Sequence, residues 1–148
     1  MSAPRRYAEG TTVTVESSRG EISGILAKHG VQRMGWTTEP EQDVLMFELG
    51  GGSYRFNIIR PTAQSLWERW KADGRSTAYL PTDAQVQAEW RRRWRANVLL
   101  LKAKLEFIAS GDTTLDRELL PYRVLKNGAT IEETMLSGGL PMLTAGAR

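Results

Sequence analysis

The clearest pattern in this chain is an apolar stripe with helical spacing between residues 86 and 108. Apolar side chains recur there every three or four positions, which is typical of one face of an amphipathic helix. The stripe consists of Val86, Trp90, Trp94, Val98, Leu101, Leu105 and Ile108. Thr82 and Gln85 have the spacing of a capping box, and Gly111 suits a left-handed helix end. We therefore predict one long helix between Thr82 and Gly111, packed on a sheet.

The second half of this helix is apolar on more than one side. Leu99, Leu100 and Phe107 lie outside the stripe and widen the apolar surface. Such a surface needs a second cover. The cover is either the C-terminal part of the chain, which would sandwich the helix against the sheet, or another molecule in an oligomer. The sequence leaves both alternatives open.

Three segments with alternating apolar residues precede the helix, at positions 31–36, 43–49 and 54–59. Alternation with a period of two predicts strands. The glycines at 50–52 suit a tight hairpin between the second and third strands, because glycine adopts positive φ without steric cost. An antiparallel meander with one apolar face follows from this pattern. The other face mixes Arg33, Arg55 and Asn57 with Val44 and Met46.

Shorter elements surround the meander. Ser18 and Glu21 have capping-box spacing, so a first helix is expected at 18–29 after an extended entry at 11–15. Further short helices are expected at 62–73, after Thr113 and after Thr130, with an extended piece at 122–125 and a turn at Asn127 and Gly128.

These elements predict an α+β fold: a helix, a three-stranded antiparallel meander, a long C-terminal helix packed on the sheet, and short C-terminal helical and extended elements. A chain of 148 residues suits a single domain, which we place at 11–136. Residues 1–10 are predicted to be a flexible lead-in, and 137–148 a loose tail, because neither segment shows periodicity.

The composition indicates where in the cell the protein is expected to act. Hydrophobic residues make up 41% of the chain, charged residues 25%, and cysteine is absent. The longest apolar run is far shorter than a membrane span, and the first residues lack the apolar segment of a secretory signal. We therefore expect a cytoplasmic protein without a membrane partner.

Catalytic and metal-binding signatures are not recognisable. With no cysteine and a single histidine, His29, a zinc site is not expected, and His29 is predicted to cap the end of the first helix. The acidic residues Glu16, Glu21, Asp43 and Glu48 fall on different elements without motif spacing. The glycine triplet joins two strands and lacks the lysine that follows in a phosphate-binding loop. We therefore predict that the protein is not an enzyme and that it holds no metal or cofactor.

Positive charge is concentrated at the start of the long helix. The whole chain carries +3, whereas residues 89–104 contain four arginines and two lysines against Glu89, a local net charge of +5. A local basic patch on a near-neutral body indicates contact with a polyanion. The alternative is a solvated helix face, with Glu89 and Arg93 paired one turn apart over the buried Trp90 and Trp94. Both interpretations stay open.

The nucleic-acid interpretation assigns a role to each residue type. Arginines supply phosphate contacts, and a tryptophan or a guanidinium plane stacks on bases. Arginines near the start of a helix also oppose its dipole, which a purely structural surface could avoid with glutamate. The candidate nucleic-acid-binding residues are Arg33, Arg55, Asn57, Trp90, Arg91, Arg92 and Arg95.

Three motifs carry a resemblance to other sequences: Glu16-Ser-Ser-Arg-Gly-Glu-Ile22, Arg93-Trp-Arg-Ala with Lys102-Ala-Lys-Leu-Glu106, and Leu120-Pro-Tyr-Arg-Val-Leu-Lys-Asn-Gly128. Together they resemble a group of small, functionally uncharacterised proteins encoded by tailed bacteriophages and prophages. The resemblance covers most of residues 13–136 and implies a phage setting, with no site residues to carry over. The predicted order of elements is also similar to double-stranded-RNA-binding domains and phage single-strand annealing proteins, as a fold-level analogy.

The leading hypothesis is a phage-encoded, non-catalytic protein of the host cytoplasm that binds nucleic acid, single-stranded DNA in preference, during replication or recombination. The alternative is a protein-interaction module, either an inhibitor of a host enzyme or defence factor or a self-assembling structural subunit. Its expected partners are a host protein or further copies of the same chain. The apolar surplus on the long helix and residues 140–143 would mediate those contacts.

Overall fold

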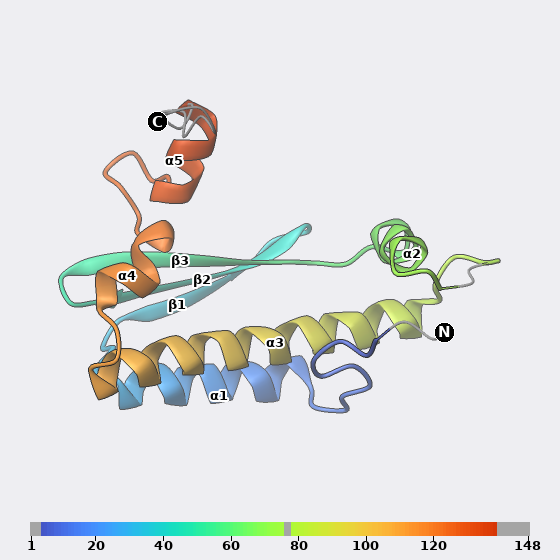
Figure 1. The fold of residues 1–148 in the computed structure, drawn as a ribbon, viewed down its shortest axis with the longest axis horizontal. Helices are drawn as coiled ribbons and strands as arrows, with labels where there is room; N and C mark the ends of the chain where they lie inside the picture. The colour runs from blue at the N-terminus through green and yellow to red at the C-terminus, as the bar shows by residue number, and fades with distance from the viewer. Residues whose placement is uncertain (1–3, 76–77, 139–148) are drawn as a thin grey trace, which may run out of the picture.

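The computed structural model describes residues 4–75 and 78–138 of the 148-residue chain. Its elements, in chain order, are α1 (Val15–Lys28), β1 (Met34–Thr38), β2 (Gln42–Leu49), β3 (Gly52–Ile59), α2 (Ala63–Ala72), α3 (Asp83–Ser110), α4 (Leu115–Leu119), the 3₁₀ turn η1 (Leu120–Tyr122) and α5 (Ile131–Gly138). The three strands form an antiparallel sheet on which the long helix α3 packs (Figure 1). The predicted α+β fold is confirmed.

The sheet is a meander with strand order β1, β2, β3. Leu49 pairs with Gly52 across a two-residue loop, in which Gly50 and Gly51 have φ angles of 57° and 81°. Positive φ at both central positions characterises the type I′ hairpin, whose twist matches that of paired strands. The predicted glycine hairpin is therefore confirmed.

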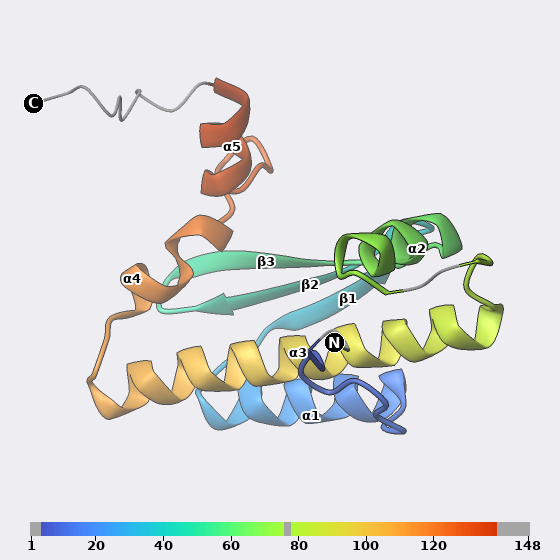
Figure 2. The same cartoon turned by 45° about the vertical axis from the view of Figure 1, so that its right-hand side comes forward.

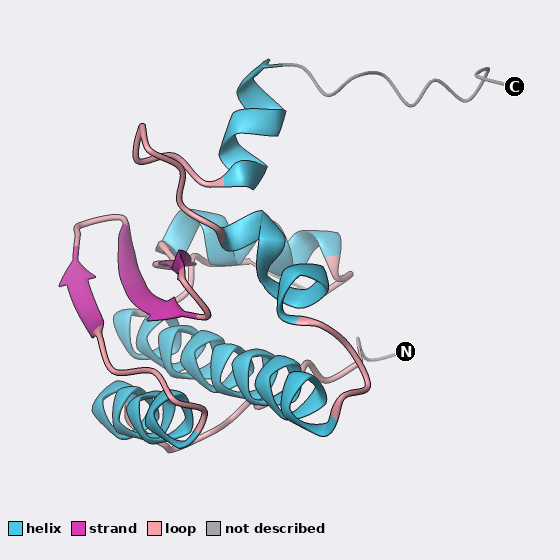
Figure 3. Cartoon of the chain, turned by 90° about the vertical axis from the view of Figure 1, so that its left-hand side faces the viewer, coloured by secondary structure: helices cyan, strands magenta, loops and turns pink. Residues whose placement is uncertain are grey.

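Helices α1 and α3 lie side by side against one face of the sheet (Figures 1 and 3). The Trp36 ring of β1 lies 5.1 Å from the Trp94 ring of α3, measured between centroids. The core between the layers includes Leu45, Phe47, Tyr54, Phe56 and Ile58 of the sheet and Trp90, Trp94, Val98, Leu101 and Leu105 of the helix. Burial of each such side chain stabilises the fold by about 1.5–3 kcal/mol. The predicted stripe is thus the face that α3 turns to the core.

The ends of α3 follow the predicted capping residues. The Thr82 hydroxyl accepts the Gln85 N–H at 3.3 Å, and the Gln85 side chain accepts the Thr82 N–H at 2.8 Å. Gly111 terminates the helix with a φ of 82°. Polar side chains adjacent in sequence determine where this helix starts, and one glycine determines where it stops.

The first helix begins earlier than predicted. Thr14, and not Ser18, caps α1, because the Thr14 hydroxyl accepts the Ser17 N–H at 3.1 Å. Ser18 is fully buried inside the helix, and the predicted extended entry at 11–15 forms no strand. The capping-box spacing of Ser18 and Glu21 therefore falls inside the helix, and the predicted start at Ser18 is wrong.

The first strand begins later than predicted, at Met34 in place of residue 31. The Val31 N–H donates to the Leu26 carbonyl at 3.0 Å, and Gly30 has a φ of 88°. These are features of a left-handed helix end, so residues 30 and 31 complete α1. His29 is the C-cap residue of α1, as predicted.

The remaining elements lie at the two ends of the sheet (Figures 1 and 2). Helix α2 follows β3 at one end, and α4, η1 and α5 are at the other. The predicted extended piece at 122–125 contributes only isolated bridges, with Arg123 opposite Tyr54 at the edge of β3. The middle of the outer sheet face carries no helix, and Met46 is exposed there.

Residues 4–10, the predicted lead-in, form turns that lie on α3. Arg6 reaches Glu89 at 2.9 Å, and the Tyr7 carbonyl accepts Arg92 at 3.4 Å. At the other terminus α5 extends to Gly138, and positions 139–148 of the predicted tail lie outside the described residues.

Leu99, Leu100 and Phe107 are 45%, 40% and 57% exposed. The described C-terminal elements do not cover them, so the residues that the structure describes do not form the sandwich that was one of the two alternatives for the second half of α3. An oligomer interface there stays a prediction. Among the described residues, no helix combines the length and the apolar character needed to cross a membrane.

Candidate nucleic-acid interface

The arginine run at the start of α3 is largely engaged within the molecule. Glu89, 5% exposed, accepts from Arg92 Nε at 2.7 Å, from Arg93 Nε at 3.1 Å and from Arg6 Nη2 at 2.9 Å. The predicted pairing of Glu89 with Arg93 one turn apart is therefore present, together with a contact from the lead-in segment. Three guanidinium groups surround one carboxylate, so this part of the run is fixed in position and not freely solvated.

The electrostatic state of Glu89 reflects this arrangement. Burial by itself would raise the pKa of the Glu89 carboxyl, but the hydrogen bonds and charges of Arg92, Arg6 and Arg93 outweigh burial and lower it. Glu89 is therefore ionised at neutral pH.

Arg95 and Arg91 differ in their partners. Arg95 Nη1 lies 2.5 Å from Glu21 of α1, and this hydrogen bond lowers the pKa of the Glu21 carboxyl. Arg91 Nε donates only to the Thr11 carbonyl, at 3.4 Å, and no carboxylate of the described residues lies within ion-pair distance of it. Of the four arginines in the run, Arg91 has a charge that the described part of the chain does not neutralise.

The tryptophans of the run belong to the core. Trp94 is fully buried and Trp90 is 6% exposed, with their rings 5.9 Å apart in an edge-to-face contact. No face of either ring is open for a base to stack on. The indole of Trp90 instead forms part of the wall of two surface hollows.

The predicted residues on the sheet lie on the face opposite α3. Strand alternation places Arg55 and Asn57 between the buried Tyr54, Phe56 and Ile58, so these polar side chains point away from the helices. Arg55 is paired with Glu133 of α5, and its Nη1 donates to the Gly128 carbonyl at 2.7 Å. The candidate residues on the sheet and those of the arginine run therefore lie on different faces of the molecule and do not share one surface.

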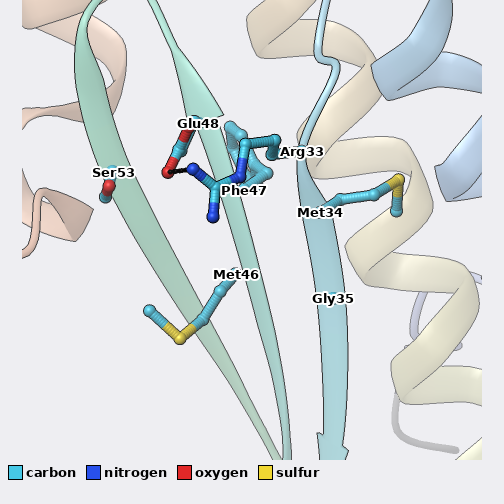
Figure 4. A pocket seen from close by; sticks show the side chains of 7 residues that line it. All are labelled: Arg33, Met34, Gly35, Met46, Phe47, Glu48 and Ser53. Atoms are coloured by element: carbon cyan, nitrogen blue, oxygen red, sulfur yellow. Dashed lines mark ion pairs between the residues drawn. The ribbon is translucent and has the colours of Figure 1, made fainter.

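Arg33 lies in a shallow hollow of about 190 Å³ on that outer face (Figure 4). Its Nη1 is 3.5 Å from Glu48 Oε1, and Figure 4 shows the guanidinium turned toward this carboxylate. Because its basic side chains have carboxylate partners, this face has no evident excess of positive charge. Binding of nucleic acid by Arg33, Arg55 and Asn57 stays a prediction.

A second buried carboxylate, which the sequence analysis treated only as a metal candidate, organises another pair of arginines. Asp43, 1% exposed, accepts from Arg60 Nη2 at 2.6 Å through one oxygen and from Arg19 through the other. The Arg19 guanidinium lies 4.9 Å from the Trp94 ring centroid, and that of Arg60 lies 4.8 Å from the Trp90 centroid. A charged residue at a core-facing position of β2 was the available signal, because a buried carboxylate needs cationic partners.

These arginines line two adjoining hollows beside Trp90. The first, of about 350 Å³, is lined by Arg19, Arg60 and Arg91, the start of α1 and Gln87. The second, of about 530 Å³, is mostly apolar and includes Ile59, Pro61 and Val86. Both have Arg60, Gln87 and Trp90 as walls, so the two hollows are adjacent, and we call the pair the arginine groove.

The groove contains two of the predicted site residues, Trp90 and Arg91. Arg92 lines a different hollow, beneath the lead-in segment, and Arg95 faces Glu21 on α1. Arg19 and Arg60 were not among the predicted site residues. Within residues 4–75 and 78–138, no group of three histidine, aspartate or glutamate side chains is placed to hold a metal ion.

Comparison with known proteins adds no identification. No protein-family model, curated protein or solved structure matches this chain. The resemblance to uncharacterised phage proteins and the absence of catalysis therefore stay predictions.

Proposed function

We propose that this protein binds nucleic acid without catalysis, and that the arginine groove is the contact surface. The supporting observation is the gathering of Arg19, Arg60 and Arg91 around one hollow, in which the buried Asp43 binds only two of the three. Guanidinium groups are the preferred protein partners of phosphate, because their planar N–H donors match its oxygens. The groove thus offers a phosphate contact that combines Arg91, a residue predicted from the sequence, with Arg19 and Arg60, which were not predicted.

The size of the groove favours a single strand. Its two hollows measure about 350 and 530 Å³, which suits individual groups of a flexible chain. A duplex keeps its bases stacked and paired, so it would offer only its backbone to so small a depression. We therefore propose single-stranded DNA as the ligand. The sequence resemblance to phage proteins supports a role in phage replication or recombination in the host cytoplasm.

The test is fluorescence anisotropy with a labelled oligothymidylate at low salt. We expect salt-dependent binding to the wild-type protein, and at least a tenfold loss with Arg91→Glu, because the reversed charge repels phosphate at the groove. Arg117→Glu is the matched control, since it makes the same charge change at an exposed arginine of α4, which lies at the other end of the sheet (Figure 1). We expect it to stay within about twofold of wild type.

Two results would contradict the proposal. One is the absence of any salt-dependent anisotropy change with the wild-type protein. The other is an equal loss from Arg117→Glu and Arg91→Glu, which would assign binding to overall charge and not to the groove. Far-ultraviolet circular dichroism and thermal unfolding of both variants establish that each is folded.

A second candidate function, self-association, is favoured by a separate observation. Leu99, Leu100 and Phe107 are exposed on the side of α3 opposite its core stripe. Contiguous apolar surface of this kind commonly marks a protein interface. If this surface mediates assembly, light scattering will detect an oligomer in the wild-type protein that Phe107→Glu dissociates. A wild-type protein that stays monomeric over a hundredfold range of concentration would exclude this candidate.

A further inference from the structure

The first hollow of the arginine groove, which Arg19, Arg60 and Arg91 line, is preorganised for a phosphate group. Asp43 and the Trp94 and Trp90 rings hold Arg19 and Arg60 in place, so little side-chain freedom is lost when a ligand binds. Arg91 adds unused donors, because within the described part of the chain it donates only through its Nε, to the Thr11 carbonyl. Its terminal N–H groups can donate to the oxygens of an incoming anion.

The charge balance of this hollow is positive. Three guanidinium groups line it, while Asp43 binds two of them and the exposed Glu16 stands at its rim. The fourteen-residue helix α1 begins at the same hollow, with Thr14 and Val15 among its walls. The positive end of the helix dipole adds to the attraction of the arginines for an anion.

The adjoining hollow has different chemistry. The apolar part of its lining consists of Pro61, Val86 and the edge of Trp90, beside polar residues that include Glu41 and Ser65. Its volume of about 530 Å³ falls within the range of small-molecule sites, about 300–1,000 Å³. Such walls suit a flat, weakly polar group such as a nucleobase, which gains by leaving water.

Gln87 stands where the two hollows meet. It lines both, it is exposed, and its side-chain amide has no hydrogen-bond partner among the described residues. A primary amide both donates and accepts, which is what the edge of a base requires. The arrangement therefore places an anion site, a hydrogen-bonding amide and an apolar site in succession.

We propose that the arginine groove binds one nucleotide unit, with its phosphate among Arg19, Arg60 and Arg91 and its base against Pro61, Val86 and the edge of Trp90. This inference rests on the proposed nucleic-acid-binding function and specifies the ligand of the same site. The nucleotide unit comes either from the 5′-phosphorylated end of a strand or from its interior. Both sources present the same phosphate and base chemistry to the groove.

Binding of small ligands tests the two hollows of the arginine groove separately. Thymidine 5′-monophosphate, thymidine and inorganic phosphate are titrated into the full-length protein while the indole N–H signals of Trp90 and Trp70 are followed by NMR. We expect the monophosphate to bind at least tenfold more tightly than either fragment, because only it occupies both hollows. The Trp90 signal should shift and the Trp70 signal should not, since Trp70 lines the separate hollow beneath the lead-in segment.

A pair of variants tests the base compartment. Val86→Ser should weaken binding of the monophosphate by at least threefold and leave the affinity for inorganic phosphate unchanged. Met46→Ser, the same kind of change at an exposed apolar residue of the outer sheet face, should alter neither. Equal binding of the monophosphate and inorganic phosphate, or equal effects of the two variants, would overturn the assignment of a base site.

Oligonucleotides distinguish the two sources and separate this inference from the proposed function. A 5′-phosphorylated oligothymidylate that binds at least tenfold more tightly than its 5′-hydroxyl form identifies a strand end as the ligand, and equal affinities identify an interior nucleotide. Either result supports the nucleotide site if the monophosphate competes with the oligonucleotide for binding.

The monophosphate also separates this inference from the proposed function. If oligonucleotides bind, but the monophosphate neither competes with them nor shifts the Trp90 signal, the nucleotide site is excluded while nucleic-acid binding stands. If no oligonucleotide binds, the proposed function fails as well.

Discussion

Two buried carboxylates organise most of the arginines that surround α3. Glu89 binds Arg6, Arg92 and Arg93, and Asp43 binds Arg19 and Arg60. In both cases a carboxylate out of contact with water is stabilised by more than one guanidinium group. Removing either carboxylate would leave several cations close together without a counter-charge, which costs more than the loss of a surface ion pair.

Glu89→Gln tests this arrangement at the level of one residue. The amide keeps the shape of the side chain but removes the charge that binds three arginines. We expect the free energy of unfolding, measured with urea, to fall by about 2 kcal/mol. Glu16→Gln, on the exposed first turn of α1, is the control and should change it by less than about 0.5 kcal/mol. Equal effects would show that Glu89 is energetically an ordinary surface residue.

The stabilising effect of Glu89 should also depend on pH. The pKa of Glu89 is lower in the folded protein than its ordinary value near 4.5. Its contribution is therefore complete above that ordinary value and is lost as the pH falls through the folded pKa. The stability difference between wild type and Glu89→Gln should shrink between pH 6 and about pH 3. A difference that stays constant across this interval would contradict the assignment.

At the scale of elements, glycines serve two opposite purposes. Gly51 in the β2–β3 hairpin has a φ of 81°, which side chains with a Cβ rarely adopt. Gly24 of α1 has no such φ, and a Cβ added there would meet open space. Glycine is needed at the first position and disfavours the helix at the second.

Alanine substitutions at these two positions should therefore have opposite signs. Gly51→Ala is expected to lower the free energy of unfolding by about 1 kcal/mol, because of strain at positive φ. Gly24→Ala is expected to raise it by about 0.5–1 kcal/mol through helix propensity. Both values can be read from urea unfolding of the single variants. Destabilisation by Gly24→Ala would indicate that the exposed face of α1 is covered in solution.

At the scale of the whole molecule, the sequence predicted the elements better than the site. The stripe on α3, the glycine hairpin and the caps of α3 are set by residues close together in the chain, so periodicity and turn chemistry identify them. The contact of Glu89 with Arg93 is equally local and was predicted. The contacts of Arg6 with Glu89 and of Arg19 and Arg60 with Asp43 join distant segments, and no spacing rule assigns such partners. The groove therefore required the three-dimensional structure.

The whole-molecule claim is that nucleic acid binds through the arginine groove, and its most direct test is the salt dependence of binding. The affinity for a single-stranded oligonucleotide is measured at several salt concentrations for wild type and Arg91→Gln. If Arg91 contacts a phosphate, the slope of log affinity against log salt should become shallower by about 0.7 in the variant. Unchanged slopes, with binding retained in both proteins, would contradict the account, because the phosphate contact would then lie elsewhere.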